Sequence, residues 1–232
     1  MAIHPEAFKK ITEELSSKKV SLVAVSKTKS SKEILELYDL GQRDFGENYV
    51  QELIDKYEEL PKDIRWHYIG HLQSNKVKFI APFVHLIHSV DSLKLLKEIN
   101  KQGIKNNRVI DCLLQVHIAR EETKFGLDES ELDDVITNNF TTDSNYPNVG
   151  VLGLMGMASF TDDVEKVTSE FSLLKSLFEK YSKHTSVNFQ FSILSMGMSA
   201  DYKTAIEEGS NMVRIGSLLF GERSPLSQAG PF

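Results

Sequence analysis

Short apolar runs that alternate with amphipathic helical patterns are the feature that most constrains the fold of this 232-residue chain. Eight runs have the character of strands, and the stretches between them carry helical patterns rather than hairpin turns. Strands joined by helices run parallel. Eight such units in roughly 200 residues favour a closed (β/α)₈ barrel over a doubly wound open sheet, which usually has fewer strands. The predicted strands are 21–27, 43–47, 66–70, 85–90, 110–117, 149–155, 188–194 and 212–220.

Helical periodicity fills the intervals between these strands. Ser30 and Glu33 form a capping-box pattern, and Thr161 is predicted to cap the longest helix, 162–182. The predicted buried stripe of that helix is Val164, Val167, Phe171, Leu174, Phe178 and Tyr181. Phe8, Ile11 and Leu15 indicate a further helix before the first strand. We therefore predict an α/β fold, a single (β/α)₈ TIM barrel over residues 1–223 with an N-terminal helix, followed by a loosely ordered tail, 224–232.

Composition excludes several classes of protein. A hydrophobic fraction of 41% and a charged fraction of 26% are typical of a soluble globular protein. The formal net charge is -6 and no long basic tract occurs, so we expect no nucleic-acid binding. No stretch approaches the ~20 apolar residues of a membrane span, and the first 17 residues lack the apolar segment of a signal peptide. The single cysteine, Cys112, cannot form an intrachain disulfide. We expect a cytoplasmic protein without a membrane partner.

Two loops have residues suited to an anion. Active sites of such barrels lie at the carboxyl ends of the strands, and phosphate often binds after strands seven and eight. The segment from Ser195 to Ser199 follows strand seven, and Gly216 with Ser217 follows Arg214 on strand eight. Glycine permits close backbone approach, and hydroxyls donate hydrogen bonds. The alternative is that Ser199 or Asp201 caps the next helix and Gly216 permits a bend; the charge of Asp201 also opposes an anion.

Lys27 ends the first predicted strand, which directs its amine into the barrel mouth. Partial desolvation would lower its pKa and leave an amine able to form an imine with an aldehyde. The alternative is an exposed lysine, as expected for Lys29 and Lys32. A lysine beside phosphate loops indicates a phosphorylated aldehyde, of which pyridoxal 5′-phosphate (PLP) is the commonest cofactor. Arg214 would then face the pyridine nitrogen. Because arginine keeps its proton, it would make the ring a poorer electron sink.

We predict no metal site. His67 and His71 are four residues apart on a predicted strand end, a span of ~13 Å, and His85 and His88 have opposite parity on their strand. Four methionines fall in or beside the strand-end loops, where they either line the mouth or fill the core: Met155, Met157, Met196 and Met198.

Segments spread along the chain resemble the pyridoxal phosphate homeostasis protein family, whose members are single-barrel relatives of the N-terminal domain of alanine racemase. They follow the family order from the first strand to the eighth. The segments are AVSKTK at 24–29, FGENYVQE at 45–52, WHYIGHLQSNK at 66–76, GLM at 153–155, LSMGMS at 194–199, VRIG at 213–216 and FG at 220–221. One departure is Gly156-Met157-Ala158, near which many relatives have a proline, so the shape of this loop is open.

The resemblance implies a role for seven residues. It implies that Lys27 forms the Schiff base with PLP and that Arg214 faces the pyridine nitrogen. Asn48 lies in a family motif at the mouth of strand two and is expected to contact the cofactor. The resemblance assigns the phosphate to Ser195, Ser199, Gly216 and Ser217. Members of the family are described as binding, buffering or delivering PLP, with no established catalytic activity.

Three functions fit these residues. The leading prediction is a monomeric, non-enzymatic protein of intracellular PLP (vitamin B6) homeostasis that buffers the cofactor or delivers it to apo PLP-dependent enzymes as transient acceptors. Alanine racemases carry a second domain after the barrel, whereas only a short tail follows here. The alternative is a PLP-dependent amino-acid racemase or related enzyme acting with the barrel alone, with Tyr68 or Tyr202 as acid or base. A third is a Schiff-base aldolase without a cofactor.

Overall fold

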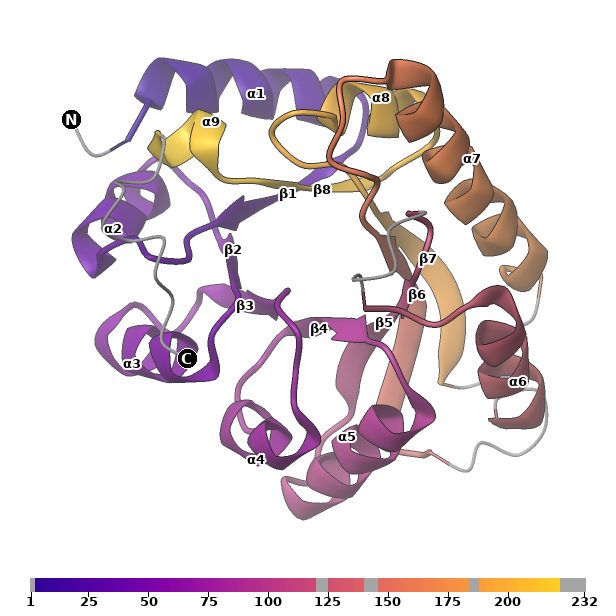
Figure 1. Cartoon of the computed structure of the whole chain (residues 1–232). Coiled ribbons are helices and arrows are strands. Elements are labelled where there is room, and N and C mark those ends of the chain that lie inside the picture. Colours follow the sequence, from indigo (N-terminus) through magenta and orange to yellow (C-terminus); the bar gives the residue numbers. More distant parts are fainter. Residues whose placement is uncertain (1–2, 120–124, 140–145, 184–187, 222–232) are drawn as a thin grey trace.

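The computed structural model describes residues 3–119, 125–139, 146–183 and 188–221. Its eight strands pair in parallel in chain order, and β8 returns to pair with β1. The closed ring of strands is seen end-on in Figure 1. The predicted (β/α)₈ barrel is therefore confirmed.

Every predicted strand is present, most with boundaries within a few residues of the prediction. The strands are β1 (Ser21–Val25), β2 (Asp44–Glu47), β3 (Arg65–Tyr68), β4 (Leu86–Val90), β5 (Ile110–Val116), β6 (Val149–Gly156), β7 (Phe189–Ser195) and β8 (Met212–Ile215). The helices are α1 (Pro5–Ser17), α2 (Ser31–Asp39), α3 (Val50–Glu59), α4 (Val77–Ile80), α5 (Leu93–Lys105), α6 (Glu129–Asn139), α7 (Val164–Tyr181), α8 (Tyr202–Glu207) and α9 (Ser217–Phe220), with a 3₁₀ turn at Ser74–Lys76.

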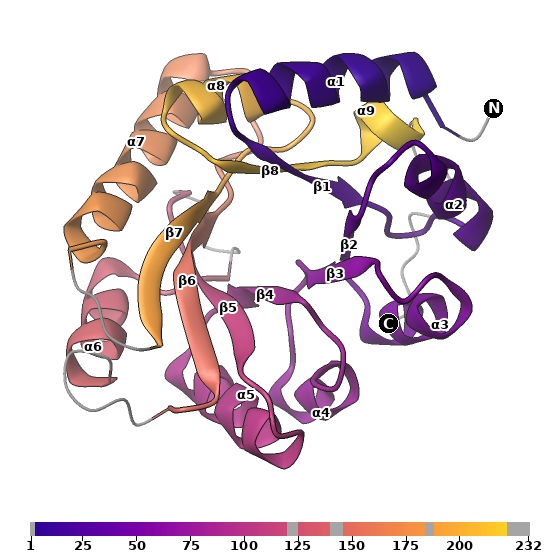
Figure 2. The ribbon, with the colours of Figure 1, turned by 180° about the vertical axis from the view of Figure 1, so that it is seen from behind.

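The helices form a ring outside the strands, which the view from behind in Figure 2 also shows. The predicted capping box of α2 is present, with the Ser30 hydroxyl and the Glu33 carboxylate exchanging hydrogen bonds with each other's backbone. Helix α1 lies beside α9, and the His4 N–H donates to the Leu219 carbonyl at 2.8 Å. Within the described ranges, no helix combines the length and apolar character needed to cross a membrane.

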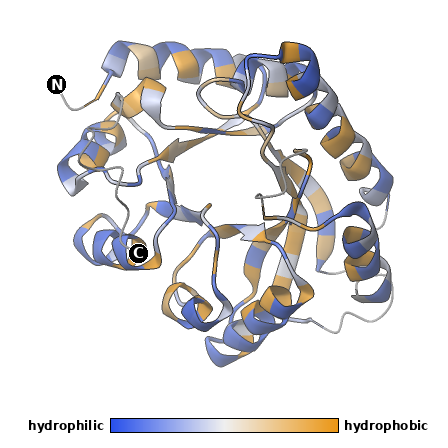
Figure 3. Ribbon diagram, viewed as in Figure 1, coloured by the Kyte–Doolittle hydropathy of each residue, from blue (hydrophilic) through white to orange (hydrophobic). Residues whose placement is uncertain are grey.

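Among the residues that the structure describes, two hydrophobic clusters make up the core. The larger lies between strands and helices and includes Phe45, Trp66 and Phe171; the helices in Figure 3 accordingly mix hydrophobic and hydrophilic residues along their length. The smaller cluster comprises Val23, Leu86, Leu113, Met155 and Met212. Val23 is paired in register with Arg214, which lines the cavity described below, so this cluster faces the barrel interior.

Strand eight is shorter than predicted. It ends at Ile215, and Ser217–Phe220 forms the short helix α9 instead of continuing the strand to residue 220. Gly216 leaves the extended conformation, with φ -122° and ψ -70°. Leu219 and Phe220 are buried in the larger cluster. The prediction of a strand as far as residue 220 is therefore wrong, because a short apolar run does not distinguish strand from helix.

The longest helix also differs from its prediction at the first turn. Asp163 caps α7 by accepting from the Lys166 N–H, while the Thr161 hydroxyl accepts from the Asp163 N–H. Val164, predicted in the buried stripe, is 64% exposed, and Leu177 is buried instead. Periodicity identifies the apolar face but not where along the helix that face stops contacting the barrel. The predicted tail, 224–232, lies outside the described residues.

A substitution of Gly153 tests how closely β6 and β7 pack at this position. The φ of Gly153 is +152°, and an added Cβ would lie 1.8 Å from the Ile193 carbonyl oxygen on β7. We expect Gly153→Ala to lower the free energy of unfolding by about 3 kcal/mol or more, because backbone strain and a backbone clash combine. Gly41, with φ +102° and nothing within 4 Å of an added Cβ, is the matched control. Gly41→Ala should cost only about 1 kcal/mol. Equal losses in urea unfolding would contradict the predicted clash.

Candidate functional site

A cavity of about 360 Å³ opens at the carboxyl end of the barrel. The loops after six strands, β1, β2, β3, β6, β7 and β8, contribute to its wall. Six of the seven residues assigned to the cofactor line it: Lys27, Asn48, Ser199, Arg214, Gly216 and Ser217. Closure of the barrel thus brings together residues that follow the first strand and residues of the last strand.

Ser195, which was expected at the phosphate, does not reach the cavity. It is fully buried at the end of β7. Its hydroxyl oxygen accepts from Arg214 Nη1 at 2.6 Å and lies 3.2 Å from His88 Nδ1. The geometry therefore favours a contact with Arg214 over a direct contact with phosphate.

The loop that carries Lys27 is held on both sides. The Ser26 hydroxyl donates to Glu47 Oε1 at 2.6 Å, and the Thr28 N–H donates to Glu52 Oε1 at 2.6 Å. Lys56 Nζ joins the two carboxylates, at 2.8 Å from Glu47 and 2.7 Å from Glu52. It also donates to the Ser26 carbonyl at 2.8 Å. This group fixes the backbone immediately before and after Lys27.

Burial strongly affects Glu47 in this group. Its side chain is completely buried. Burial raises the pKa of Glu47 to about 7, against the opposing effect of Lys56. The carboxyl group therefore holds its proton more tightly in the folded protein than in the unfolded chain.

Arg214 brings a buried positive charge to the cavity. Nη1 donates to the carbonyl and the hydroxyl of Ser195, and Nη2 donates to the Gly156 carbonyl at 3.0 Å. Burial lowers the pKa of Arg214 to about 10. The guanidinium still carries its proton at neutral pH and can only donate hydrogen bonds.

The loops after β7 and β8 are linked. The Gly216 N–H donates to the Ser199 hydroxyl at 3.2 Å, and the Arg214 N–H donates to the Gly197 carbonyl at 3.0 Å. Gly197 has a φ of +95°, and an added Cβ would lie 2.6 Å from Ala205 Cβ, so the turn requires glycine. Asp201 Oδ1 accepts from the Met198 N–H at 2.6 Å. This hydrogen bond occupies one oxygen of the Asp201 carboxylate, whose charge counted against an anion site in the sequence.

The wall suits a phosphorylated aromatic aldehyde. It combines the Lys27 amine, the Arg214 guanidinium and hydroxyls from two adjacent loops. Asn48 Oδ1 is buried without a hydrogen-bond partner in the described part of the chain, so a bound donor would satisfy it. The residues present therefore fit PLP.

Sequence reasoning missed part of the wall. The loop after β6 contributes Ala158, Ser159 and Phe160, and its composition gave no signal. Of the four methionines, Met157 and Met198 line the cavity, whereas Met155 and Met196 are fully buried in the core.

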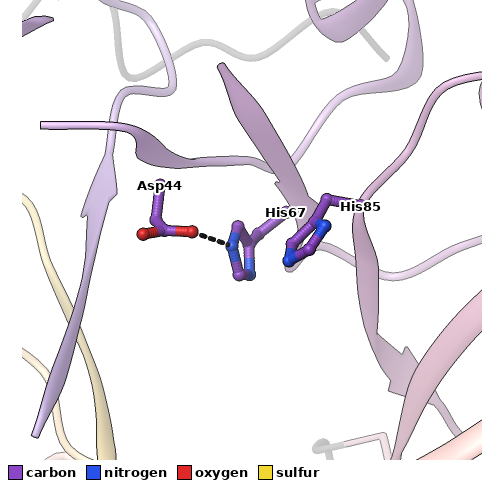
Figure 4. Close-up of side chains that lie close together, drawn as sticks. All are labelled: Asp44, His67 and His85. Atoms are coloured by element: carbon purple, nitrogen blue, oxygen red, sulfur yellow. Dashed lines mark hydrogen bonds and ion pairs between the residues drawn. The ribbon is translucent and has the colours of Figure 1, made fainter. Parts of the chain in front are cut away.

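A second hollow of about 270 Å³ lies at the opposite end of the barrel. Its lining includes Asp44, His67 and His85, which offer ligand atoms within 4.8 Å of one another (Figure 4). Histidine spacing along single strands did not reveal this cluster, because its members come from β2, β3 and the residue directly before β4.

Glu47 gives the site a pH dependence. The folded pKa of about 7 exceeds the ordinary value of 4.5, so the folded state binds more protons between these values. The free energy of unfolding should therefore fall as pH rises from 4.5 towards 7. We expect Glu47→Gln, which cannot ionise, to reduce this slope in urea titrations. An unchanged slope would show that another group is responsible.

Comparisons with known proteins agree with this geometry. The family model described as alanine racemase, N-terminal domain, matches residues 5–224. A pyridoxal phosphate homeostasis protein of Aquifex aeolicus is 44% identical over 203 residues, covering 87% of this chain and 86% of the relative. The human pyridoxal phosphate homeostasis protein is 41% identical over 212 residues, covering 87% and 76%.

Solved structures show the same similarity. PipY of Synechococcus elongatus with PLP bound has a TM-score of 0.84 and 32% identity, covering 94% of this chain and 99% of that chain. Alanine racemase of Bartonella henselae, 17% identical with a TM-score of 0.69, covers 97% of this chain and 62% of the racemase, and shares the fold. By the extent and identity of these matches, the chain belongs to the pyridoxal phosphate homeostasis protein family.

Proposed function

We propose that the protein binds PLP, holds it as a Schiff base on Lys27 and serves in intracellular PLP homeostasis by buffering or delivering the cofactor. The observation that carries the proposal is the single cavity that joins Lys27 to Arg214 and to the hydroxyls of Ser199 and Ser217. The homeostasis proteins of Aquifex aeolicus and human, and PipY with PLP bound, support the choice of ligand.

Each residue of the wall would have one task. Lys27 would bind the aldehyde carbon, and Ser199, Gly216 and Ser217 would hold the phosphate. Arg214 would donate to the pyridine nitrogen, and Asn48 would contact the cofactor. PLP supplies a reactive carbonyl and an electron sink. Because arginine does not give up its proton, Arg214 would leave the ring nitrogen unprotonated and weaken the sink.

The positions of two tyrosines favour a non-enzymatic role over a racemase. The Tyr68 hydroxyl donates to the carbonyls of Asn48 and His71, at 2.9 and 3.1 Å, and burial raises its pKa to about 12. The Tyr202 hydroxyl donates to Glu14 at 3.2 Å. Neither tyrosine lines the cavity, so neither is placed as an acid or base for an amino acid bound there.

Lys27 is tested by chemical labelling. The protein is loaded with PLP, reduced with borohydride and mapped by peptide mass, and the pyridoxyl group should be found on Lys27. Lys27→Ala should remove both the label and the visible absorption band. Lys29→Ala is the matched control, because Lys29 also lines the cavity but donates to the Phe220 carbonyl at 3.0 Å; it should keep both. A label on Lys29 or a colourless wild type would refute the proposal, and the latter would favour the aldolase.

Catalysis and delivery need a separate measurement. PLP-loaded protein is incubated with each amino acid in deuterium oxide, and exchange at Cα is followed. In a second assay, PLP-loaded protein is mixed with a cytoplasmic apo-enzyme and a scavenger of free PLP. The homeostasis role predicts that PLP reaches the apo-enzyme, and that less than one Cα exchange per site occurs in the same period. Repeated exchange would support the racemase. The proposed monomer is checked by gel filtration of the same preparation.

A further inference from the structure

Four hydrogen-bonded contacts, three of them buried and the last partly buried, connect the cofactor cavity with the opposite end of the barrel. Arg214 Nη1 lies 2.6 Å from the Ser195 hydroxyl oxygen, which lies 3.2 Å from His88 Nδ1. His88 Nε2 lies 2.9 Å from His67 Nδ1. His67 Nε2 lies 3.0 Å from Asp44 Oδ1, the contact drawn in Figure 4.

The residues of this hydrogen-bonded chain come from β2, β3, β4, β7 and β8, so the hydrogen bonds cross the barrel interior. His67, His88, Ser195 and Arg214 are all at most 3% exposed. Asp44 lies at the start of β2, where its carboxylate also accepts from Arg65 Nε at 2.7 Å. A buried polar chain of this kind is favourable only if every member is paired.

With both histidines neutral, the two ends of the hydrogen-bonded chain, Arg214 and Asp44, leave one direction for every hydrogen bond between them. Arg214 has donors only, so the Ser195 oxygen accepts from it. The Ser195 O–H can then donate to His88 Nδ1, which leaves the His88 proton on Nε2. That N–H donates to His67 Nδ1, and the remaining His67 proton on Nε2 donates to Asp44.

The carboxylate at the far end accepts hydrogen bonds only, which agrees with this direction. Although burial opposes ionisation, hydrogen bonds from His67 and Arg65 hold the pKa of Asp44 below its usual value. Complete burial lowers the pKa of His88 well below its usual value, which favours the neutral ring.

We propose that Asp44, His67, His88 and Ser195 are positioning residues that hold Arg214 in place for the cofactor, with both histidines as the neutral Nε2–H tautomer. The part played by Arg214 towards PLP rests on the proposed function, whereas the tautomers do not. The chain would keep the guanidinium at one fixed site on the cavity wall without a carboxylate partner in direct contact.

The cluster of Asp44, His67 and His85 has a competing interpretation as a metal site. Arg65 donates to both oxygens of the Asp44 carboxylate, at 2.7 and 2.5 Å, and His67 Nε2 lies within hydrogen-bond distance of the same group. A metal ion would need a lone pair on His67 Nε2 and would place a second positive charge beside Arg65. The hydrogen-bonded chain accounts for these contacts without either change.

The direction of the chain is tested directly by long-range ¹H–¹⁵N spectra of ligand-free protein labelled on histidine. We expect His67 and His88 to be neutral at pH 7.5, each with its proton on Nε2. An Nδ1–H tautomer at either residue, or a charged His67, would overturn the assignment. Shifts of His67 and His85 on adding equimolar Zn²⁺ would also overturn it and would assign a metal site instead.

The positioning role is tested by Ser195→Ala, which removes one hydrogen bond to a buried charge. We expect PLP to bind about tenfold more weakly, with an altered absorption spectrum of the bound cofactor. Ser89→Ala is the matched control, since Ser89 is equally buried beside His88 but its hydroxyl has no partner in the described residues. Ser89→Ala should leave affinity and spectrum unchanged. Equal effects of the two variants, or none from Ser195→Ala, would refute the positioning role.

A remote variant separates this proposal from the proposed function. Asp44→Asn changes the far end of the chain without touching the cavity, and it should allow a second tautomer at His67, whereas Ser89→Ala should not. If Lys27 fails to label but the tautomers are found, the chain stands and its role towards PLP falls. If Lys27 is labelled but the tautomers differ, the proposed function stands and the hydrogen-bonded chain is refuted.

Discussion

The pairing of β8 with β1 is the constraint on which the remaining structure depends. It closes the barrel and sets Val23 beside Arg214 in register, and Ala24 beside Ile215. Alternation along β1 then places Val25 in the cavity wall, with Lys27 two residues further on. Without closure, the amine and the guanidinium would belong to opposite edges of an open sheet. The site is therefore a consequence of the topology, and neither terminal strand forms it alone.

The structure stabilises buried charge in two places. Around Lys27, one ammonium group, Lys56, binds two carboxylates at short distance. Across the interior, the positive charge of Arg214 is linked to the negative charge of Asp44 through neutral groups. In both cases each charge has a hydrogen-bonded partner, as buried ions require. The same contacts that satisfy these charges also fix the two residues proposed to meet the cofactor.

The sequence was informative wherever a pattern is local. Short apolar runs and period-3.6 patterns located all eight strands and the major helices. Strand-end position and family motifs pointed to Lys27, Arg214 and the loops after β7 and β8, which the structure brings to one cavity. It failed where the decisive contact is between strands. Ser195 is separated by 107 residues from His88, so nothing near Ser195 in the sequence indicates that its hydroxyl faces inward. Nothing local in the sequence marks Lys56 either, because its partner Glu47 lies on the preceding strand.

The contact between α1 and α9 links the loops at the cavity to the surface of the molecule. Helix α9 begins directly after Gly216 and lies beside α1, with the His4 backbone joined to Leu219. Lys29, two residues after Lys27, donates to the carbonyl of Phe220 at the end of the same short helix. An affinity tag, a truncation or a bound protein that displaces α1 would thus disturb the backbone that leads into the cofactor loops. Helix α1 consequently supports the loops at the cavity from outside, although none of its described residues lines the cavity wall.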